Sequence, residues 1–360
     1  MKVAVLGIGL IGGSIGLAAR LRAGAQVCGY DPDAAVGARA LELGAIDTQA
    51  ADLHAAVDGA DVVFAATPVG ALPATVRDAL AGAGPACVVS DVGSTKRVLS
   101  DAARDERFVG GHPLAGAETA GVEHARADLF DGAVWYLTPT PATTGVLYER
   151  LHRLIASFGA QPSAIDADLH DRLMACFSHL PHVLANLLVE QGSARIAGAL
   201  ESGERLPAAG PSFRDATRVA GANTAIWADI YLANRDALVS EIDEAVRRLG
   251  EVRALLAAGD AAAITDWNDR ARGAGQALRG AGGADGEPVH ELRVAVPNRP
   301  GVLAEIALTL GREGVNIVDM ALSPSADNSQ GVIALWLRGA EHAGRAERLV
   351  AELGFPVAAP

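Results

Sequence analysis

The stretch with the clearest chemical potential is RFVGGHPLAGAE, residues 107–118, which places His112 between a Gly-Gly pair and a proline. Glycine tolerates unusual backbone angles and proline interrupts a β-ladder, so the pattern predicts a rigid turn after a short strand at Phe108-Val109. Turns at strand ends in α/β proteins often carry reactive groups. A histidine there could act as a general acid or base, although one that only bonds its own loop fits the same pattern.

A second candidate site lies at the amino terminus, where a glycine-rich turn follows the apolar run Val3–Leu6. The turn reads Gly7-Ile8-Gly9-Leu10-Ile11-Gly12 and leads into an Ala- and Leu-rich helical pattern. In a dinucleotide-binding unit the first glycine permits a tight turn, the second admits the pyrophosphate and the third lets helix and strand pack closely. Asp31 ends the next predicted strand, where its carboxylate can accept hydrogen bonds from the adenosine ribose. No arginine follows closely to receive a 2′-phosphate, so NAD is favoured over NADP.

Alternating strands and helices must position these residues. Apolar strands are predicted at 60–69 and 86–96, with helical stretches at 71–82 and 95–105. This alternation predicts a Rossmann-like, doubly wound parallel sheet whose ligands gather at the carboxyl ends of its strands. Three polar turns then meet at one edge, which favours a functional role for His112. The residues expected to bind the cofactor are Gly7, Gly9, Leu10, Ile11, Gly12, Asp31, Thr67 and Pro68.

From about residue 165 the strands stop and the pattern becomes helical. His179 and His182 lie three residues apart around Pro181, and a proline inside a helical pattern kinks the helix, often near a functional site. A third ligand at metal-binding spacing is missing from the sequence nearby, so a polar pair facing a substrate is favoured and no metal is predicted.

Arginines follow in the segment 210–238. Arg214 and Arg218 lie four apart with Asp215 between them, and Trp227 comes later. An ordinary solvated helix face explains the pattern, but one inward arginine could instead grip a carboxylate bidentately. Helical stretches at 229–257 and 260–279 have long apolar faces, which predict a homodimer.

Composition bounds the function. A chain of 360 residues predicts two or three domains, and a formal net charge of −13 opposes nucleic acid or an anionic membrane as a partner. An anionic substrate therefore needs locally placed cations. Three separated cysteines predict reduced thiols in a cytoplasmic protein. The glycine spacing of the apolar amino terminus argues against a secretory signal, and no other apolar run is expected to span a bilayer.

Five motifs, in order, resemble those of the prephenate and arogenate dehydrogenases of tyrosine biosynthesis. They are GLIGGS (9–14), DVGSTK (91–96), GGHPLAG (110–116), SHLPH (178–182) and FRDATR (213–218) with Ile226-Trp227. The resemblance covers residue 1 to about 279 and implies an NAD-dependent oxidative decarboxylation. In that reaction hydride leaves the ring carbon bearing the hydroxyl, carbon dioxide departs and the ring becomes aromatic.

The resemblance also implies roles for individual residues. His112 matches the histidine that accepts a hydrogen bond from the ring hydroxyl, and Ser94 the serine that orients that histidine and the nicotinamide. Arg218 matches the arginine that binds a substrate carboxylate. The other pocket residues implied by the match are His179, His182 and Trp227.

Two departures leave the substrate open. Ala117 stands where family members often have threonine, and Gly210-Pro211-Ser212 replaces a glycine run. Both changes touch the expected substrate pocket, so they leave open whether the substrate carries prephenate's keto group or arogenate's amino group. Prephenate is the expected substrate and arogenate the alternative. A β-hydroxyacid dehydrogenase is disfavoured because such enzymes use a catalytic lysine on a long helix and this chain has only Lys2 and Lys96. A catalytically silent regulator that binds NAD and an amino acid would be expected to lack His112, Ser94 or Arg218.

The carboxyl-terminal part resembles an ACT domain, a small amino-acid-sensing module, in PNRPGVLA (297–304) and GVNI (314–317). Its order is predicted as strand, helix, strand, strand, helix, strand. The expected ligand-binding residues are Asn298, Gly301, Val302 and Asn316, and L-tyrosine is the expected effector, unless the module only dimerises. The predicted division is 1–165 for NAD binding, 166–279 for a helical substrate and dimerisation domain, 280–288 for a glycine-rich linker and 289–360 for the ACT domain.

Overall fold

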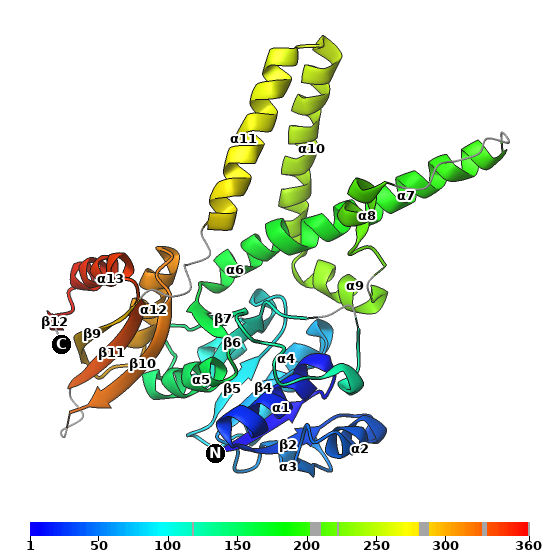
Figure 1. Cartoon of the computed structure of the whole chain (residues 1–360). Coiled ribbons are helices and arrows are strands. Elements are labelled where there is room, and N and C mark those ends of the chain that lie inside the picture. The colour runs from blue at the N-terminus through cyan, green and yellow to red at the C-terminus, as the bar shows by residue number, and fades with distance from the viewer. Residues whose placement is uncertain (117–118, 202–209, 222, 281–287, 326–329, 359–360) are drawn as a thin grey trace. The chain divides into compact units, whose positions relative to one another are not determined.

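The computed structural model of the chain describes residues 1–116, 119–201, 210–221, 223–280, 288–325 and 330–358 (Figure 1). These residues form two compact units. The first combines Met1–Met174, Gly221–Ala233 and Val289–Pro360, and the second combines Ala175–Ala220 with Asn234–Pro288. The predicted linker at 280–288 lies almost entirely outside the described residues, as does Ala117.

An eight-stranded sheet is the centre of the first unit, with strand order β3-β2-β1-β4-β5-β6-β7-β8. Its strands are β1 (Lys2–Leu6), β2 (Gln26–Tyr30), β3 (Thr48–Gln49), β4 (Val62–Ala65), β5 (Val88–Asp91), β6 (Phe108–Pro113), β7 (Val134–Thr138) and β8 (Gln161–Ala164). The predicted doubly wound α/β sheet is confirmed, but it is not wholly parallel, because β6 and β7 pair antiparallel. The chain between these two strands contains no α-helix among its described residues, so it makes no helical crossover of the kind that a parallel pair needs.

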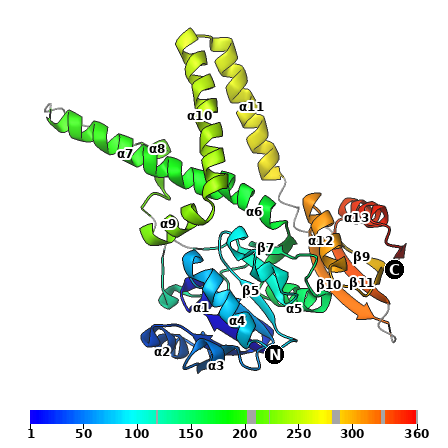
Figure 2. The same cartoon turned by 180° about the vertical axis from the view of Figure 1, so that it is seen from behind.

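Helices cover both faces of this sheet (Figures 1 and 2). They are α1 (Leu10–Ala23), α2 (Ala34–Glu42), α3 (Leu53–Val57), α4 (Leu72–Gly82) and α5 (Gly145–Ser157). Strand β1 shows how the sequence produces two layers: Val3 and Val5 belong to one buried cluster, and Ala4 and Leu6 to another. Alternate residues of a strand face opposite sides, so an entirely apolar strand is buried on both.

The helix predicted at 95–105 is replaced by two short 3₁₀ turns, Arg97–Leu99 and Ala102–Arg104. The backbone amides of Lys96 and Arg97 donate to the Asp171 carboxylate, at 2.8 and 2.9 Å. Capture of these amides by a side chain distant in sequence replaces the local bonds that would begin an α-helix, a competition that local propensity cannot foresee.

The second unit is helical. It contains a π-helical turn (Ala175–His179), α7 (Leu180–Glu201), α8 (Pro211–Thr217), α10 (Arg235–Ala258) and α11 (Ala261–Gly280). The irregularity predicted near Pro181 is present as the π-turn just before it, which follows α6 (Ala167–Met174) of the first unit. The single helix predicted at 229–257 is divided at Asn234, between α9 (Thr224–Ala233) and α10.

Among the described residues, one helical stretch, Ala167–Ala197, is long and apolar enough to cross a membrane by length and composition alone, contrary to expectation. Only 28% of its most apolar window is buried inside the chain. Its uncovered apolar surface therefore needs a partner of some kind, and helical domains that form dimers have the same property.

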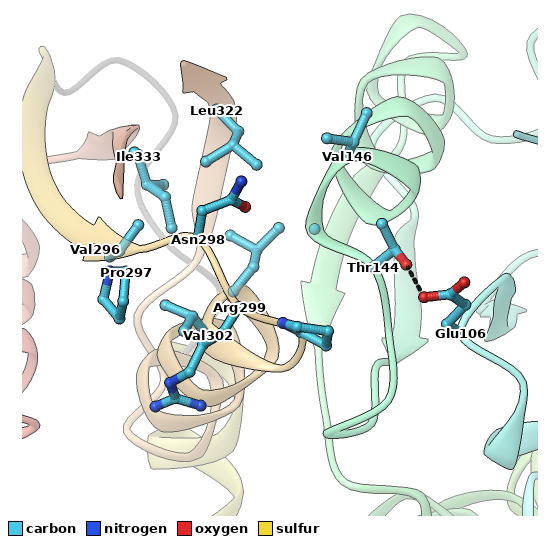
Figure 3. A pocket seen from close by; sticks show the side chains of 14 residues that line it. Glu106, Thr144, Val146, Val296, Pro297, Asn298, Arg299, Val302, Leu322 and Ile333 are labelled. Carbon is cyan, nitrogen blue, oxygen red and sulfur yellow. Dashed lines mark hydrogen bonds between the residues drawn. The ribbon is translucent and has the colours of Figure 1, made fainter. Parts of the chain in front are cut away.

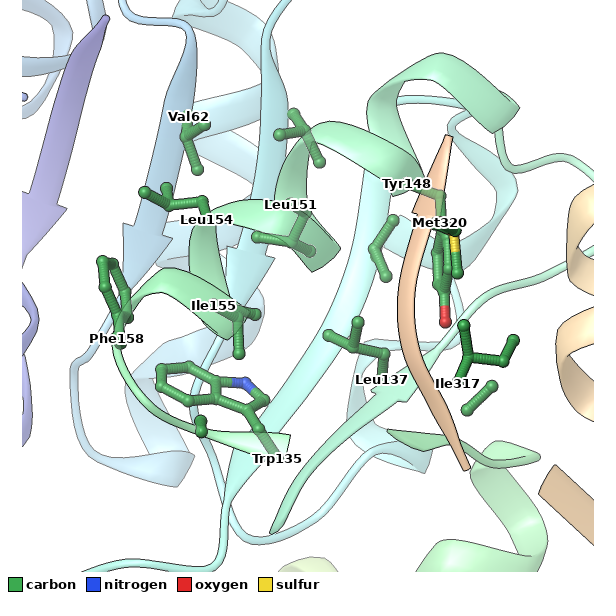
Figure 4. Close-up of a cluster of buried hydrophobic side chains, with 14 of the residues drawn as sticks. Val62, Trp135, Leu137, Tyr148, Leu151, Leu154, Ile155, Phe158, Ile317 and Met320 are labelled. Atoms are coloured by element: carbon green, nitrogen blue, oxygen red, sulfur yellow. The ribbon is translucent and has the colours of Figure 1, made fainter. Parts of the chain in front are cut away.

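The carboxyl-terminal module has the predicted order: β9 (Val289–Pro297), α12 (Val302–Arg312), β10 (Ile317–Pro324), β11 (Gln330–Arg338), α13 (Ala340–Glu352) and β12 (Val357–Ala358). Its sheet has the order β10-β11-β9-β12 and is antiparallel throughout. Buried side chains of this module and of the part built on the eight-stranded sheet form one hydrophobic cluster, in which Tyr148 and Leu137 lie near Ile317 and Met320 (Figure 4).

Candidate active site in the nucleotide-binding unit

The glycine-rich turn after β1 has the geometry that the sequence predicts. Gly7 has φ +90°, which favours glycine, and a Cβ on Gly12 would lie 1.9 Å from the Gly7 carbonyl oxygen. A Cβ on Gly9 would meet nothing within 4 Å, which leaves open space where a pyrophosphate would approach. The Asp31 carboxylate accepts a hydrogen bond from the Ile8 amide at 2.8 Å, so the ribose-binding candidate is tied to the phosphate-binding loop. Leu10 and Ile11 form the first turn of α1.

The sequence pattern predicted that His112 lies on a turn, and this prediction is wrong. His112 is inside β6, where it pairs with Tyr136 of β7. The glycines before it serve close packing instead of turning the chain. A Cβ on Gly110 would lie 2.3 Å from Thr138 Oγ1, and one on Gly111 would lie 2.6 Å from the Asp91 carbonyl oxygen.

A buried ion pair fixes the backbone next to His112. Asp91, at the end of β5, and Lys96 form an ion pair in which both side chains are at most 1% exposed. Asp91 Oδ1 accepts from the Gly111 amide at 3.0 Å, and Lys96 Nζ donates to the Gly111 carbonyl. Burial is the largest influence on the Lys96 ammonium and lowers its pKa, while Asp91 opposes that effect. The ion pair thus holds both the backbone amide and the carbonyl of Gly111, the residue before His112.

His112 Nδ1 lies 2.9 Å from Nε2 of His170 on α6. His170 Nδ1 in turn lies 2.8 Å from Oδ1 of Asp171. Burial alone would raise the pKa of Asp171, but the hydrogen bond from His170 and those from the Arg97 and Lys96 amides outweigh burial and hold that pKa below its usual value. Burial lowers the pKa of His170, against the opposing influence of Asp171. The structure therefore contains a line of hydrogen bonds from an anion to His112.

Ser94, expected to orient His112, has a buried hydroxyl oxygen with no hydrogen-bond partner in the part of the chain that the structure describes. Such an oxygen suits a site that a bound molecule completes. Thr67 and Pro68 follow β4 after one intervening residue, and Thr67 Oγ1 lies 3.2 Å from Thr75 Oγ1. Together with the open space at Gly9, these features fit a dinucleotide running along the carboxyl edge of the sheet.

The remaining substrate-site candidates divide between the two units. In the helical unit, His179 is buried and its Nδ1 lies 3.2 Å from Asn234 Nδ2. His182 Nδ1 lies 3.4 Å from Asn186 Nδ2, and burial lowers the pKa of His182. Arg218 is an exposed residue at the end of α8. Trp227 belongs to the first unit, on α9, where its ring centroid is 5.5 Å from that of Tyr231.

Three consecutive parts of the chain are similar to domains of known proteins. Residues 15–163 match the nucleotide-binding domain of prephenate dehydrogenase, residues 166–268 its dimerization domain, and residues 290–348 the ACT domain. Prephenate dehydrogenase of Bacillus subtilis is 32% identical over 361 residues, covering 97% of this chain and 96% of that protein. The chain belongs to the prephenate dehydrogenase family.

Two solved structures resemble this family member along most of their length. Prephenate dehydrogenase from A. aeolicus, in complex with hydroxyphenyl propionate and NAD⁺, has a TM-score of 0.68 at 25% identity, covering 77% of this chain and 98% of that one. Synechocystis arogenate dehydrogenase has a TM-score of 0.66 at 25% identity, covering 77% and 100%. The expectations of an NAD-dependent oxidoreductase with a Rossmann-like domain, a helical dimerisation domain and an ACT domain are confirmed.

Sequence reasoning missed three residues of this dehydrogenase: Asp91, His170 and Asp171. Asp91 opens the motif DVGSTK, and the adjacent pair His170-Asp171 lies in the predicted helix before His179. The available signal was a histidine–aspartate pair in a helix that otherwise has apolar periodicity. Its connection to His112 is made across 58 residues, so only the fold reveals it.

A cavity of about 160 Å³ lies between the ACT module and the nucleotide-binding part (Figure 3). The ACT module contributes Asn298, Arg299 and Val302, and the other wall contains Glu106 and Thr144. Thr144 Oγ1 donates to Glu106 at 3.0 Å. Of the predicted effector-binding residues, Asn298 and Val302 line this cavity. Gly301 and Asn316 are not among its lining residues.

Proposed function

We propose that this enzyme oxidatively decarboxylates prephenate to 4-hydroxyphenylpyruvate with NAD in tyrosine biosynthesis. The observation that carries the proposal is His112, held rigidly at the carboxyl end of a strand by a buried ion pair and by His170. A histidine so placed can accept a proton or hydrogen bond from a ring hydroxyl as the oxygen becomes a carbonyl.

The chain's own residues would divide the work as follows. NAD, when bound along the glycine-rich loop, would take the hydride from the carbinol carbon. His112 would hold the hydroxyl proton and return it when loss of carbon dioxide makes the ring aromatic and the oxygen a phenol. Ser94 would bind near the nicotinamide and Asp31 near the ribose. Because the net charge is −13, a substrate carboxylate requires a placed cation, and Arg218 is the proposed one.

Other pocket roles stay proposals on the strength of the motifs. His179, His182, Trp227 and Ala117 are proposed to line the substrate pocket, with Thr67, Pro68, Leu10 and Ile11 at the cofactor. Arogenate is the second candidate substrate, favoured by the likeness to Synechocystis arogenate dehydrogenase. Free cysteines at positions 28, 87 and 176 support a cytoplasmic location.

A homodimer is proposed because the helical unit exposes an apolar stripe. On α10, Val239, Val246, Leu249 and Leu256 are each at least half exposed. Their spacings of seven, three and seven residues put them on one side of the helix, the pattern of helices that pack on a partner. The uncovered apolar stretch Ala167–Ala197 lies in the region matched to the dimerization domain, which favours a subunit interface over a membrane.

L-Tyrosine is proposed as a feedback effector that binds in the cavity between the ACT module and the nucleotide-binding part. An amino acid needs a cation and helix amides for its carboxylate and an anion for its ammonium group. Arg299 and the amides at the start of α12 would bind the carboxylate, and Glu106 would bind the ammonium group. To act, tyrosine must bind two states of the enzyme with different affinity.

The test is NADH formation followed by absorbance, with prephenate and arogenate offered in parallel to the purified enzyme and NAD. We expect turnover of prephenate and a loss of about 10²–10⁴-fold in kcat for His112→Asn, with an unchanged melting temperature. Turnover of arogenate alone would establish the second candidate. Turnover of neither by folded wild-type enzyme would contradict the proposed function and favour a silent regulator.

A further inference from the structure

The hydrogen bonds behind His112 determine which of its nitrogens carries a proton. Asp171 is the residue in this chain of hydrogen bonds whose protonation is settled first. Its two oxygens accept hydrogen bonds from the backbone amides of Lys96 and Arg97, and its pKa is held below the usual value. An ionised carboxylate only accepts hydrogen bonds, so His170 Nδ1, 2.8 Å from Asp171, must be the N–H donor.

The protonation of His170 then determines which partner is the donor in its hydrogen bond with His112. Burial keeps His170 neutral, and a neutral imidazole with a proton on Nδ1 has a lone pair on Nε2. His170 Nε2 is therefore an acceptor, and its partner 2.9 Å away, His112 Nδ1, is the donor. With its proton on Nδ1, a neutral His112 presents the lone pair of Nε2 as its base.

We propose that His170 is a positioning residue that fixes His112 in the Nδ1–H tautomer and so supplies the lone pair that receives the substrate's hydroxyl proton. The role of this lone pair in catalysis rests on the proposed function, whereas the tautomer follows from the hydrogen-bond geometry alone. An acceptor that orients a histidine in this way also makes it a stronger base, because it stabilises the imidazolium that forms. Here His170 is the acceptor for His112, and Asp171 is the acceptor for His170.

In the part of the chain that the structure describes, the charged and titratable groups besides His112 that act on or contact His170 come from its own helix, from the β5 segment and from β7. Asp171 is its immediate neighbour, with the Arg97 guanidinium 3.8 Å from Asp171. The buried pair Lys96 and Asp91 acts on His170 in opposite directions. From β7, the Tyr136 ring meets it edge-on at 5.7 Å between centroids. Packing also orients the two imidazoles, whose planes cross at 74° with centroids 5.1 Å apart.

The first measurement is the tautomer itself, read by NMR from two-bond ¹H–¹⁵N couplings in the wild-type protein labelled with ¹⁵N-histidine, without substrate. His112→Asn assigns the signal. We expect a protonated Nδ1 and an unprotonated Nε2 on His112 at neutral pH. The opposite tautomer would overturn the proposal, whatever the enzyme's activity.

The second measurement compares His170→Leu with His170→Gln, whose side-chain oxygen can still accept from His112. For His170→Leu we expect kcat to fall about 10–100-fold with an unchanged KM for the substrate. The acid limb of the kcat/KM profile should move to lower pH, because His112 without its acceptor is a weaker base. His170→Gln should recover most of the loss.

His54→Leu, which replaces an exposed histidine on α3, is the control and should behave as wild type. A folded His170→Leu enzyme with the wild-type rate and pH profile would overturn the proposal. If that variant does not fold, the tautomer in the wild-type protein decides alone. If wild type turns over neither prephenate nor arogenate, the proposed function fails, while the tautomer measurement still tests the role of His170.

Discussion

At the scale of single residues, the site depends on groups that cannot tolerate change because they are buried among polar partners. Asp91 accepts from the Gly111 and Gly93 amides as well as pairing with Lys96. A buried pair is costly to form, and removing one partner leaves the other charge without compensation. The position of His112 therefore depends on a buried ion pair that holds the backbone of the preceding residue, Gly111.

Lys96→Met should reduce the free energy of unfolding by about 3–5 kcal/mol, because Asp91 would remain buried as an uncompensated charge. Lys2→Met, at an exposed position and the only other lysine, should change it by less than about 0.5 kcal/mol. Urea unfolding followed by circular dichroism gives both values. Equal losses in the two variants would show that the Asp91–Lys96 pair does not stabilise the fold.

At the scale of helices and strands, sequence reasoning succeeded where local chemistry decides. The glycine-rich turn, the alternation of β1 to β5 with helices and the strand–helix order of the ACT module all follow from hydrophobic period and turn residues. It failed where distant partners decide. Asp171 captured the amides that would have begun a helix at Lys96, and close packing, not a turn, required Gly110 and Gly111.

The candidate site shows the same limit. His112 was found from its glycine and proline neighbours, whereas His170 has no local feature beyond an adjacent aspartate in a helical pattern. A hydrogen bond between positions 58 residues apart exists only once β6 and α6 are packed. Motifs therefore pointed to His112 as a candidate, and tertiary structure was needed to find its hydrogen-bond partner His170.

The apolar stripe of helix α10 is predicted to be a dimer interface. Leu249→Glu places a charge in the middle of its apolar stripe, and we expect a dimeric wild-type protein to become monomeric in this variant. Leu21→Glu is the matched control, since Leu21 is 71% exposed on α1 and Leu249 is 60% exposed. Light scattering coupled to gel filtration measures the mass. A wild-type monomer, or a dimer that survives Leu249→Glu unchanged, would contradict this interface.

At the scale of the whole chain, the cavity beside the ACT module, where an effector is proposed to bind, and His112 are connected through one strand. Glu106, on the cavity wall, comes two residues before β6 begins, and His112 lies near the other end of β6. The ACT module shares a hydrophobic cluster with α5 and β8, so it is built into this unit of the protein. A ligand that contacts Glu106 would thus act on the strand that carries His112, the proposed base.

Glu106→Gln should weaken inhibition by L-tyrosine about 10–100-fold in the concentration for half-inhibition, because a charged partner for the ammonium group is lost. The rate without tyrosine should remain that of wild type. Glu347→Gln, at an exposed position on α13, serves as the control. Tyrosine titrations of NADH formation provide the measurement, and wild-type sensitivity in Glu106→Gln would remove Glu106 from the effector site.

The close packing around Gly110 and Gly111 determines how this enzyme could be redesigned. Even a methyl group at either position would overlap Thr138 or the Asp91 backbone, so a mutant library that varies the whole GGHPLAG segment would consist mostly of misfolded proteins. Gly116, where a Cβ would meet nothing within 4 Å, has room for a side chain. Diversity aimed at new ring substrates therefore belongs on the carboxyl-terminal side of His112, and the two glycines before it should be left untouched.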